Sequence, residues 1–344
     1  MNRFAYISGT GSYTPPRQVS NEQLGTVYGV EVPDRWIRRR TGIESRRFAE
    51  PGVGSAEMGA HAARAALDQA GLEARDLDLI IVATLSPEHA FPGSGVYLQR
   101  RLGLCEGESA TFVPALDVRN QCSGFLYGLS VATAQVRAGM ARHVLLVGAE
   151  THSAAMDFSK RGRAVTSLFG DAAGAAIVSA TSEDRGVRDC RLGADGRHAD
   201  ALAQKVWDIR ERPFIPVDER GLGRIDPASL WPAMDGATVF KHAVTRMSRA
   251  LKELCERAGI GLDELDLVFF HQANLRINEA VGKRLGIPEE KMPHNIERFG
   301  NTTAATIPLL LAETTRDGRL RRGHKIALVT FGSGFTWGAA LIDW

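Results

Sequence analysis

Cysteine is scarce in this sequence, and the few cysteines present form no metal-binding or disulfide pattern. The 344 residues include four cysteines, none of them in a C-x-x-C pair: Cys105, Cys122, Cys190 and Cys255. This spacing lacks the common zinc-ligand motifs and argues against a disulfide framework. Scattered thiols are typical of a reducing compartment. We therefore expect a cytoplasmic protein with no metal and no redox cofactor.

Long hydrophobic runs and an excess of one charge are also absent. No apolar run approaches the ~20 residues that span a bilayer, and the first residues lack the long apolar core of a signal peptide. Lysine and arginine number 42 and aspartate and glutamate 40, for a net charge of +2. This balance is not typical of a nucleic-acid-binding protein, although local basic patches can still matter. We expect neither a membrane nor a nucleic acid as a partner.

The chain resembles itself at an offset of about half its length. Two pairs of segments match: 62–82 with 247–270, and 139–148 with 322–329. The longer segments have the pattern of a helix, a glycine and a buried strand, and the shorter ones that of a turn and an apolar strand. Alternating helices and buried strands predict parallel or mixed sheets covered by helices. We predict two similar α/β halves, 1–178 and 179–344, although two unrelated strand–helix units could match by coincidence.

Cys122 lies where a strand pattern ends and a helix begins that is apolar or small on every face, up to Gly139. A helix of this kind belongs inside a protein, and a cysteine at its N-terminus sits at the positive end of the helix dipole. This position is expected to lower the pKa of the thiol and to favour the reactive thiolate. The alternative is a buried structural cysteine.

Polar residues in the second half occupy comparable places. Asn301 precedes the helix pattern at 307–315 that corresponds to the helix after Cys122, so a pseudo-twofold axis would bring both residues together. His271 ends a buried strand, where α/β sheets commonly line binding crevices. The glycines of 331–338 can leave backbone N–H groups free to form an oxyanion hole. The ordinary alternatives are a helix cap, a structural histidine and a hairpin turn.

A cysteine, a histidine and an asparagine together favour carbonyl chemistry through a thioester. A thiolate can attack an acyl thioester and hold the acyl group covalently. Histidine and asparagine can then donate hydrogen bonds to the enolate oxygen that decarboxylation creates. A cysteine protease also needs cysteine and histidine, with the histidine as a base beside the thiol. The residues alone leave that alternative open.

The chain resembles the 3-oxoacyl-acyl-carrier-protein synthase III family of the thiolase superfamily over essentially its whole length. The motifs that carry the resemblance are 122–125, 271–277, 300–308 and 331–338. It implies an α/β, thiolase-like five-layer αβαβα fold with a mixed five-stranded sheet in each half. It also implies a catalytic set of Cys122, His271 and Asn301, and an oxyanion hole from the backbone N–H groups of Cys122 and Ser333. The implied reaction is decarboxylative Claisen condensation of an acyl-CoA with malonyl-acyl carrier protein through an acyl-cysteine.

The resemblance further implies a coenzyme A site. Trp36 and Arg40 match residues that stack on adenine and contact phosphates, and Arg161 matches the second face of the adenine clamp. Stacking and cation–π contacts give this arrangement a physical basis. Asn274 matches a residue beside the pantetheine arm. Phe91 matches a phenylalanine that reaches the acyl pocket of the partner subunit, since members of the family are usually homodimers.

A basic patch is implied for docking of the acidic carrier protein. Its residues match or neighbour those around the tunnel mouth in the family: Lys241, Arg276, Lys283 and Arg284. A solvated charged face is the alternative explanation for these side chains.

Two departures from the family pattern bear on the substrate. Asn120 and Gln121 precede the cysteine, where family members that start fatty-acid synthesis usually have alanines. The segment 201–232 is longer than usual and lies where the family builds part of the acyl pocket; it carries Trp207, Arg210, Arg212, Arg220 and Trp231. One rival function is therefore a related enzyme of specialised metabolism that joins two acyl-CoAs or transfers the acyl group to oxygen or nitrogen. The other rival is a catalytically silent partner subunit, against which the intact catalytic set argues.

Overall fold

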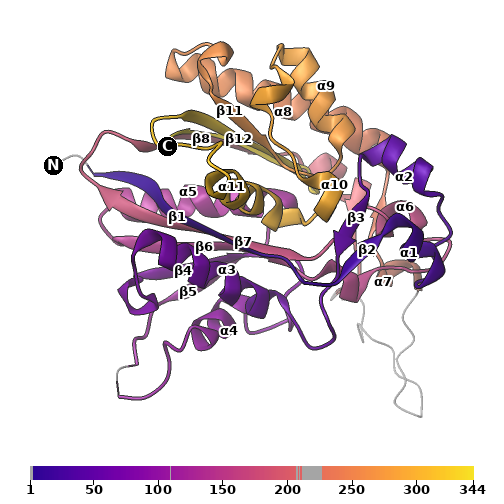
Figure 1. The fold of residues 1–344 in the computed structure, drawn as a ribbon, viewed down its shortest axis with the longest axis horizontal. Helices are drawn as coiled ribbons and strands as arrows, with labels where there is room; N and C mark the ends of the chain where they lie inside the picture. Colours follow the sequence, from indigo (N-terminus) through magenta and orange to yellow (C-terminus); the bar gives the residue numbers. More distant parts are fainter. Residues whose placement is uncertain (1–2, 109, 207, 209, 211–226) are drawn as a thin grey trace.

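The first half of the chain forms a mixed five-stranded sheet in the computed structural model, which describes residues 3–108, 110–206, 208, 210 and 227–344 (Figure 1). In spatial order its strands are β1 (Phe4–Tyr13), β7 (Ala172–Thr181), β6 (His143–Glu150), β4 (Leu79–Ala83) and β5 (Ala115–Val118). β4 runs parallel to β5 and β6, whereas β7 runs antiparallel to β1 and β6. The predicted boundary at residue 178 falls inside β7.

The second sheet repeats this arrangement. Its strands in spatial order are β8 (Gly186–Ala194), β13 (Thr336–Asp343), β12 (Lys325–Gly332) and β11 (Leu267–Phe270). β11 runs parallel to β12, and β13 runs antiparallel to β12 and β8, as β4, β6, β7 and β1 do in the first sheet. The predicted α/β class with two mixed sheets is confirmed.

The second sheet has four strands among the described residues, one fewer than expected. The segment of the second half that corresponds to β5 forms a short helix, α10 (Ile296–Phe299), instead of a strand. Pro293 precedes this helix and has no N–H to donate to a strand ladder.

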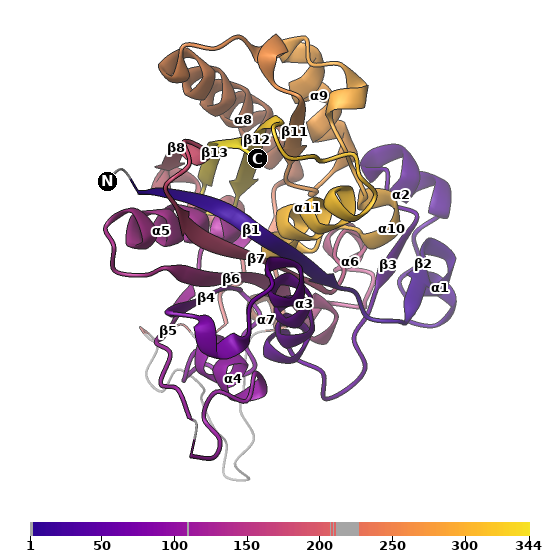
Figure 2. The same ribbon diagram turned by 60° about the vertical axis from the view of Figure 1, so that its left-hand side comes forward.

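Helices form three layers around and between the two sheets (Figure 2). One outer layer is α3 (Ser55–Ala70) and α4 (Ser94–Arg101), and the other is α8 (Gly236–Ala258) and α9 (Leu275–Leu285). The central layer is α5 (Gly124–Arg137) and α11 (Thr306–Arg316). The predicted five-layer αβαβα order is confirmed, and the predicted buried helix after Cys122 is α5.

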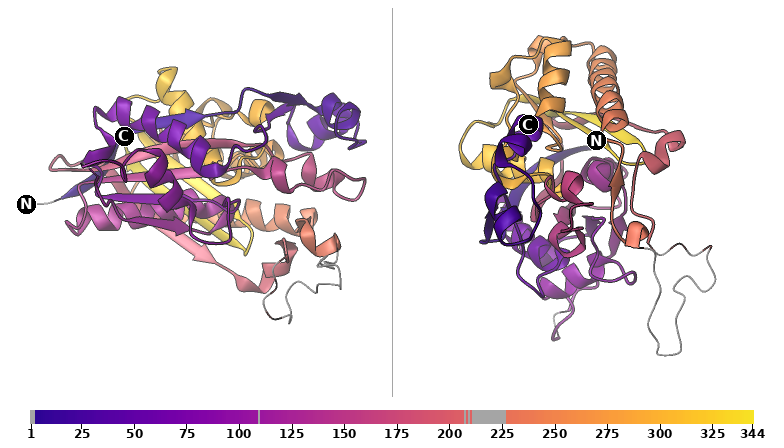
Figure 3. Two further views of the ribbon diagram at one scale, coloured as in Figure 1. Left: turned by 90° about the horizontal axis from the view of Figure 1, so that it is seen from below. Right: turned by 90° about the vertical axis from the view of Figure 1, so that its right-hand side faces the viewer.

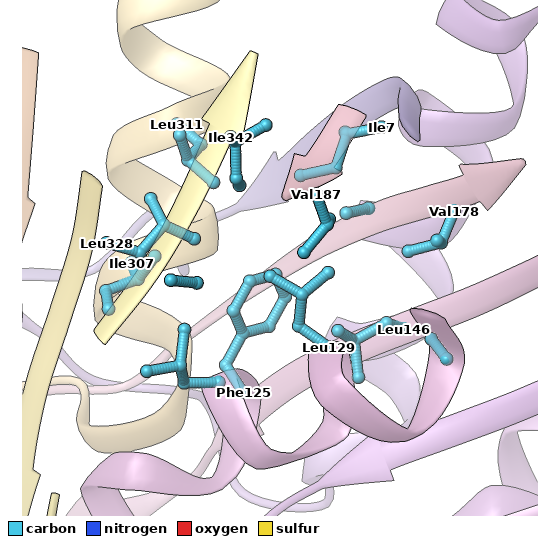
Figure 4. Close-up of a cluster of buried hydrophobic side chains, with 14 of the residues drawn as sticks. Ile7, Phe125, Leu129, Leu146, Val178, Val187, Ile307, Leu311, Leu328 and Ile342 are labelled. Carbon is cyan, nitrogen blue, oxygen red and sulfur yellow. The ribbon is translucent and has the colours of Figure 1, made fainter. Parts of the chain in front are cut away.

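The central core explains why α5 and α11 are apolar on all sides. Phe125 and Leu129 of α5 and Ile307 of α11 pack between residues of both sheets, as Figure 4 shows. Leu146 comes from the first sheet and Leu328 from the second. Because most of each helix is buried between the two sheets, its sequence lacks the broad polar stripe of a surface helix.

The remaining elements are short, and several gather at one end of the two-sheet body (Figure 1, Figure 3). The gathered elements are β2 (Gln18–Ser20), β3 (Ser45–Arg47), α1 (Asn21–Thr26) and α2 (Asp34–Thr41). The others are α6 (Arg163–Thr166), α7 (Pro227–Leu230), β9 (Leu202–Ala203) and β10 (Ala233–Met234). The 3-10 helices are η1 (Ala74–Asp76), η2 (Gln121–Ser123), η3 (His152–Ala155), η4 (Gly196–Ala201), η5 (Leu262–Glu264), η6 (Glu289–Lys291) and η7 (Thr303–Ala305).

Both pairs of matching segments in the sequence occupy matching places in the fold. α3, η1 and β4 follow one another in the first half as α8, η5 and β11 do in the second, and β6 corresponds to β12. No helix in the described ranges is long and apolar enough to cross a bilayer. In the segment 201–232, Trp207, Arg212 and Arg220 lie outside the described residues, so its part in an acyl pocket stays a prediction.

Two glycines allow the central layer to lie directly on the backbone of the first sheet. A Cβ atom on Gly148 of β6 would lie 2.3 Å from the carbonyl oxygen of Ala304 in η7. A Cβ atom on Gly174 of β7 would lie 2.5 Å from the backbone nitrogen of Leu309 in α11. The second half of the chain therefore touches the first sheet at van der Waals distance along its backbone.

We expect Gly148→Ala to reduce the free energy of unfolding by roughly 1–3 kcal/mol, the usual penalty for an overpacked core. The added methyl group would meet backbone atoms of Ala304, which cannot rotate away. Urea unfolding measures this change. Gly196→Ala is the matched control, because no atom lies within 4 Å of its Cβ position. Equal stability of the two variants would contradict the close approach.

Candidate active site

Cys122 lies in η2, directly before α5, at the place where the two halves meet. Its carbonyl oxygen accepts a hydrogen bond from Thr330 Oγ1 of β12 at 2.9 Å. Gln121 before it has a φ of 46°, and Thr303, at the corresponding place in η7, has a φ of 49°. Such left-handed conformations are costly for residues other than glycine and are concentrated at functional sites. The two 3-10 turns therefore present an equivalent, strained backbone to one another.

The Cys122 thiol is protonated in this environment, contrary to the expectation from its helix position. Burial, together with the nearby charge of Glu150, raises the pKa of the thiol to about 12. A hydrogen bond from the Thr303 side chain acts in the opposite direction. The predicted position at a helix N-terminus is confirmed, but the predicted low pKa is wrong because desolvation outweighs the neighbouring groups that favour the thiolate.

His271 follows β11 and is held by both the backbone and a side chain. Its backbone N–H donates to the carbonyl oxygen of Val329 at 2.8 Å, which extends the strand pairing by one residue. Its Nδ1 lies 2.7 Å from Thr306 Oγ1, at the start of α11. Burial lowers the pKa of the imidazole to about 3, so the ring is neutral near neutral pH. Nε2 has no partner within the described part of the chain and is the ring atom available to a substrate.

Thr306 controls which nitrogen of His271 carries the proton. Its hydroxyl lies 3.0 Å from the carbonyl oxygen of Thr303 and 2.7 Å from His271 Nδ1. A hydroxyl has a single proton to donate. When that proton goes to Nδ1, the imidazole proton is on Nε2, and the ring can donate a hydrogen bond to a substrate oxygen.

Asn301 is positioned by a short parallel pairing with the first half of the chain. Its backbone N–H donates to Leu168 at 2.8 Å, and its carbonyl oxygen accepts from Gly170 at 3.1 Å. The side-chain Oδ1 accepts from the backbone N–H of Thr303 at 2.8 Å. Oδ1 thus begins the η7 turn, as a capping residue would, while Nδ2 remains as a donor.

Thr303 joins the three sequence-predicted catalytic residues into one group. Its side chain lies next to the thiol of Cys122, and its N–H donates to Asn301 Oδ1. The hydroxyl of Thr306 lies between the carbonyl oxygen of Thr303 and His271 Nδ1. The structure therefore brings Cys122, His271 and Asn301 together from three distant segments.

Two further ionisable residues lie in this site and were not anticipated from the sequence. Glu150 is fully buried at the end of β6, where burial raises the pKa of its carboxyl group to about 7. His152 follows in η3, and its Nε2 lies 2.5 Å from Thr303 Oγ1. Burial lowers the pKa of His152 to about 3. The sequence does carry a signal for Glu150, which is a carboxylate at the end of a buried strand, because strand ends line the crevices of α/β sheets.

The glycine-rich loop between β12 and β13 lies against the nucleophile. A Cβ atom on Gly332 would be 3.0 Å from Cys122 Cβ and 3.2 Å from its backbone nitrogen. Thr336 Oγ1 lies 3.2 Å from both Ser123 Oγ and the carbonyl oxygen of Ser333. These contacts hold the backbone of Ser333 beside η2, as an oxyanion hole built from both segments requires.

The residues expected to bind coenzyme A lie near the gathered elements at the end of the molecule. The Arg40 guanidinium stacks over the ring of Trp36 at 4.6 Å. Arg161 is exposed, and its Nε donates to Asp157 at 2.7 Å. The half-buried Trp36 packs on the same hydrophobic cluster as Met156 and Val165, which flank Arg161 in the chain. Asn274 caps α9 by accepting from the N–H of Arg276 at 2.9 Å.

The residues expected to dock the carrier protein do not all have free side chains. Arg276 donates to the carbonyl oxygens of Arg39 and Arg38 at the end of α2 and pairs with Glu279 at 2.7 Å. It therefore holds α9 to α2. Lys241 of α8 and Lys283 and Arg284 of α9 are exposed. Phe91 is also exposed, at 85%. Within the described ranges no cluster of histidine, cysteine or acidic residues could hold a metal ion.

The neutral state of His271 has a measurable consequence for stability. The folded chain keeps this imidazole unprotonated down to a pKa of about 3, while the unfolded chain binds a proton near the ordinary histidine pKa of about 6.5. Stability is therefore lost as the pH falls below 6.5. From about pH 7.5 to about pH 5, we expect wild type to lose about 2 kcal/mol relative to His271→Asn, which does not titrate. Urea unfolding at the two pH values measures this difference, and parallel pH dependence of the two proteins would contradict a buried neutral His271.

Comparisons with known proteins agree with this geometry. The family description 3-oxoacyl-[acyl-carrier-protein (ACP)] synthase III matches residues 116–196, and its C-terminal counterpart matches 255–344. The structure resembles 3-oxoacyl-[acyl-carrier-protein] synthase III from Aquifex aeolicus VF5, with a TM-score of 0.86, 36% identity and 99% and 100% of the two chains covered. It also resembles the priming β-ketosynthase of the R1128 polyketide biosynthetic pathway, with a TM-score of 0.85, 33% identity and 99% and 96% covered.

The beta-ketoacyl-[acyl-carrier-protein] synthase III of Sphingopyxis alaskensis is 42% identical to this sequence, over 99% of each chain. An identity of this size over the full length, together with the shared fold, leaves one assignment: the chain belongs to the 3-oxoacyl-[acyl-carrier-protein] synthase III family of acyltransferases.

Proposed function

We propose that this protein condenses an acyl-CoA with malonyl-acyl carrier protein, with loss of CO2, to give a 3-oxoacyl product for fatty-acid synthesis. The observation that carries the proposal is the group formed around Thr303, in which Cys122, His271 and Asn301 converge at the junction of the two halves. Membership of the family supplies the reaction, and the site contains each group that the reaction needs.

In the first half-reaction, Cys122 takes the acyl group. Its sulfur attacks the thioester carbonyl, and the carbonyl oxygen becomes an oxyanion. Backbone N–H groups of Cys122 and Ser333 stabilise that charge, which exists only in the transition state and the intermediate. The bond to the coenzyme A sulfur then breaks, which leaves an acyl-cysteine. Trp36, Arg40, Arg161 and Asn274 hold the coenzyme A during this step.

In the second half-reaction, His271 and Asn301 stabilise the enolate. Both donate hydrogen bonds, from Nε2 and Nδ2, to the thioester carbonyl oxygen of the malonyl group. Loss of CO2 leaves its electron pair on that enolate, and the carbanion attacks the acyl-cysteine. The Cys122 sulfur leaves as the new carbon–carbon bond forms. A neutral His271 suits this role because it can donate without first binding a proton.

We also propose a homodimer in a reducing compartment. Phe91 and Phe112 are 85% and 86% exposed, and large aromatic side chains of this kind are typical of surfaces that a partner covers. A partner subunit would give Phe91 its expected place in the acyl pocket. All four cysteines are free thiols, as expected in the cytoplasm.

A second candidate is a related enzyme of specialised metabolism. Two observations favour it: Asn120 and Gln121 precede the nucleophile, and the chain is 33% identical to the R1128 priming β-ketosynthase. The acyl chain and the acceptor distinguish the two candidates.

Cys122→Ala is expected to abolish formation of an acyl adduct, and His271→Ala to preserve the adduct but slow decarboxylation by at least about 10²-fold, the usual loss when a transition-state donor is removed. Intact-protein mass spectrometry after incubation with acyl-CoAs, followed by malonyl-carrier protein, measures both steps. Cys105→Ala, which changes an exposed thiol, is the control and should behave as wild type.

Full condensation by either active-site variant would overturn these roles. An adduct on wild type that ignores malonyl-carrier protein would favour the second candidate. Failure of any acyl-CoA to label wild type would favour a catalytically silent subunit.

Arg284→Glu is expected to raise the KM for malonyl-carrier protein by roughly tenfold and to leave the KM for acyl-CoA nearly unchanged, because complementary charge acts on the protein partner. Arg284 is a cleaner test than Arg276, whose substitution would also free the end of α2. Steady-state kinetics with each substrate varied in turn measures both constants. Arg75→Glu, on the exposed η1 turn, is the charge-matched control. Equal changes in the two KM values would refute docking at Arg284.

A further inference from the structure

The proposed reaction requires Cys122 to lose a proton, yet burial holds its thiol in the protonated form. His271 is bonded to Thr306 and serves the second half-reaction through Nε2. The site contains a second buried histidine, His152, that this mechanism does not use. Its position relative to the nucleophile suggests how the proton leaves.

Polar groups lead from the nucleophile to His152. The Thr303 side chain lies next to the Cys122 thiol, where it favours the ionised sulfur, and its Oγ1 lies 2.5 Å from His152 Nε2. Glu150 Oε2 lies 3.9 Å from the same nitrogen. Thr303 and Glu150 are completely buried, and His152 is 6% exposed. These groups are therefore shielded from solvent that could compete as a proton acceptor.

The protons along this path can be arranged in two ways. A hydroxyl can accept one hydrogen bond while it donates another. In one arrangement the thiol donates to Thr303 Oγ1, and Thr303 donates to the neutral His152. In the other, the imidazolium of His152 donates to Thr303, and Thr303 donates to the thiolate. Moving two protons, one on each side of Oγ1, converts the first arrangement into the second.

Two features of the surroundings offset part of the cost that burial places on the charged arrangement. The thiolate lies at the N-terminus of α5, where the helix dipole favours negative charge. The imidazolium lies beside Glu150, and its positive charge would in turn favour the ionised carboxylate. A buried charge is costly when isolated, but here each charge forms next to a compensating one.

We propose that His152, acting through Thr303, accepts the proton of Cys122 when the acyl group is transferred. The inference rests on the proposed function. As the Cys122 sulfur attacks the thioester carbon, its proton passes to Thr303 Oγ1, and the hydroxyl proton of Thr303 passes to His152 Nε2. As the carbon–sulfur bond of the acyl-CoA breaks, the same path returns a proton to the departing coenzyme A sulfur. His152 is thus a positioning residue for the nucleophile, and it is neutral again when acyl transfer is complete.

Other ionisable groups also face His152. The buried Asp171 lies beside the backbone of His152, and the His152 ring packs on Phe169 with centroids 4.7 Å apart. His271 approaches the same turn from the second half through Thr306. The carboxyl group of Glu150 is the only one of these in ion-pair range of His152 Nε2 among the described residues.

Alkylation of Cys122 by iodoacetamide tests the relay without any acyl substrate. The rate would be followed by intact mass in a Cys105→Ala background, from about pH 6 to about pH 10. His152→Gln keeps an amide able to bond Thr303 but accepts no proton. We expect it to slow alkylation at neutral pH by roughly 10²-fold, as for loss of a general base. The deficit should shrink as the pH rises, because hydroxide then removes the thiol proton directly.

Thr303 provides a matched pair of variants that does not depend on the folding of His152→Gln. Thr303→Ser retains the hydroxyl and should alkylate as wild type, whereas Thr303→Val should be as slow as His152→Gln. The double variant His152→Gln/Thr303→Val should be no slower than the slower single variant, because both remove one path. Wild-type rates for Thr303→Val, or a deficit that is the same at every pH, would overturn the relay.

Comparing alkylation with acylation distinguishes failure of the relay from failure of the proposed function. Acylation of wild type by acetyl-CoA and octanoyl-CoA is measured in parallel by intact mass. A normal alkylation profile with no acyl adduct would contradict the synthase function but not the relay. Acylation of wild type and Thr303→Val at equal rates would contradict the relay but not the synthase function.

Discussion

The contact between the backbone of the first sheet and the η7 turn is the constraint on which the rest of the site depends. Gly148 allows that turn to lie against β6, since any side chain there would meet the carbonyl group of Ala304. Thr303, one residue earlier, then reaches the Cys122 thiol from the opposite half of the molecule. A small outward shift of η7 would separate the nucleophile, Asn301 and Thr306 from one another. The position of the catalytic group is thus set by close packing of backbone on backbone.

Burial determines the protonation state of every ionisable group in this site. It raises the pKa values of Cys122 and Glu150 and lowers those of His152 and His271. All four shifts favour the neutral form, because removal from water penalises charge of either sign. The resting site is therefore poorly reactive, and charge can develop only where a compensating partner is adjacent. This suits an enzyme that must protect a thiol from reaction until a thioester has entered.

The two halves of the internal repeat contribute different chemical groups to the site. η2 and η7 occupy equivalent places and share an unusual backbone, but only the first carries a thiol. Ala304 stands where Cys122 stands in the other half. The second half instead contributes polar side chains at Asn301 and His271. A duplicated scaffold thereby places a nucleophile and the donors for its substrate opposite one another without any change in the sheet order.

The sequence by itself determined the α/β class, the repeat, the buried helix after Cys122 and the three residues expected to act together. Each follows from local pattern: hydrophobic period, glycine stops, and motifs at strand ends. The tertiary structure decided what depends on desolvation and on contacts across the repeat. It replaced the expected low pKa of Cys122 with a high one, tied Arg276 to the end of α2, replaced one expected strand by α10, and placed His152 and Glu150 beside Thr303. Burial and long-range contact are properties of the packed chain, and no local pattern reports them.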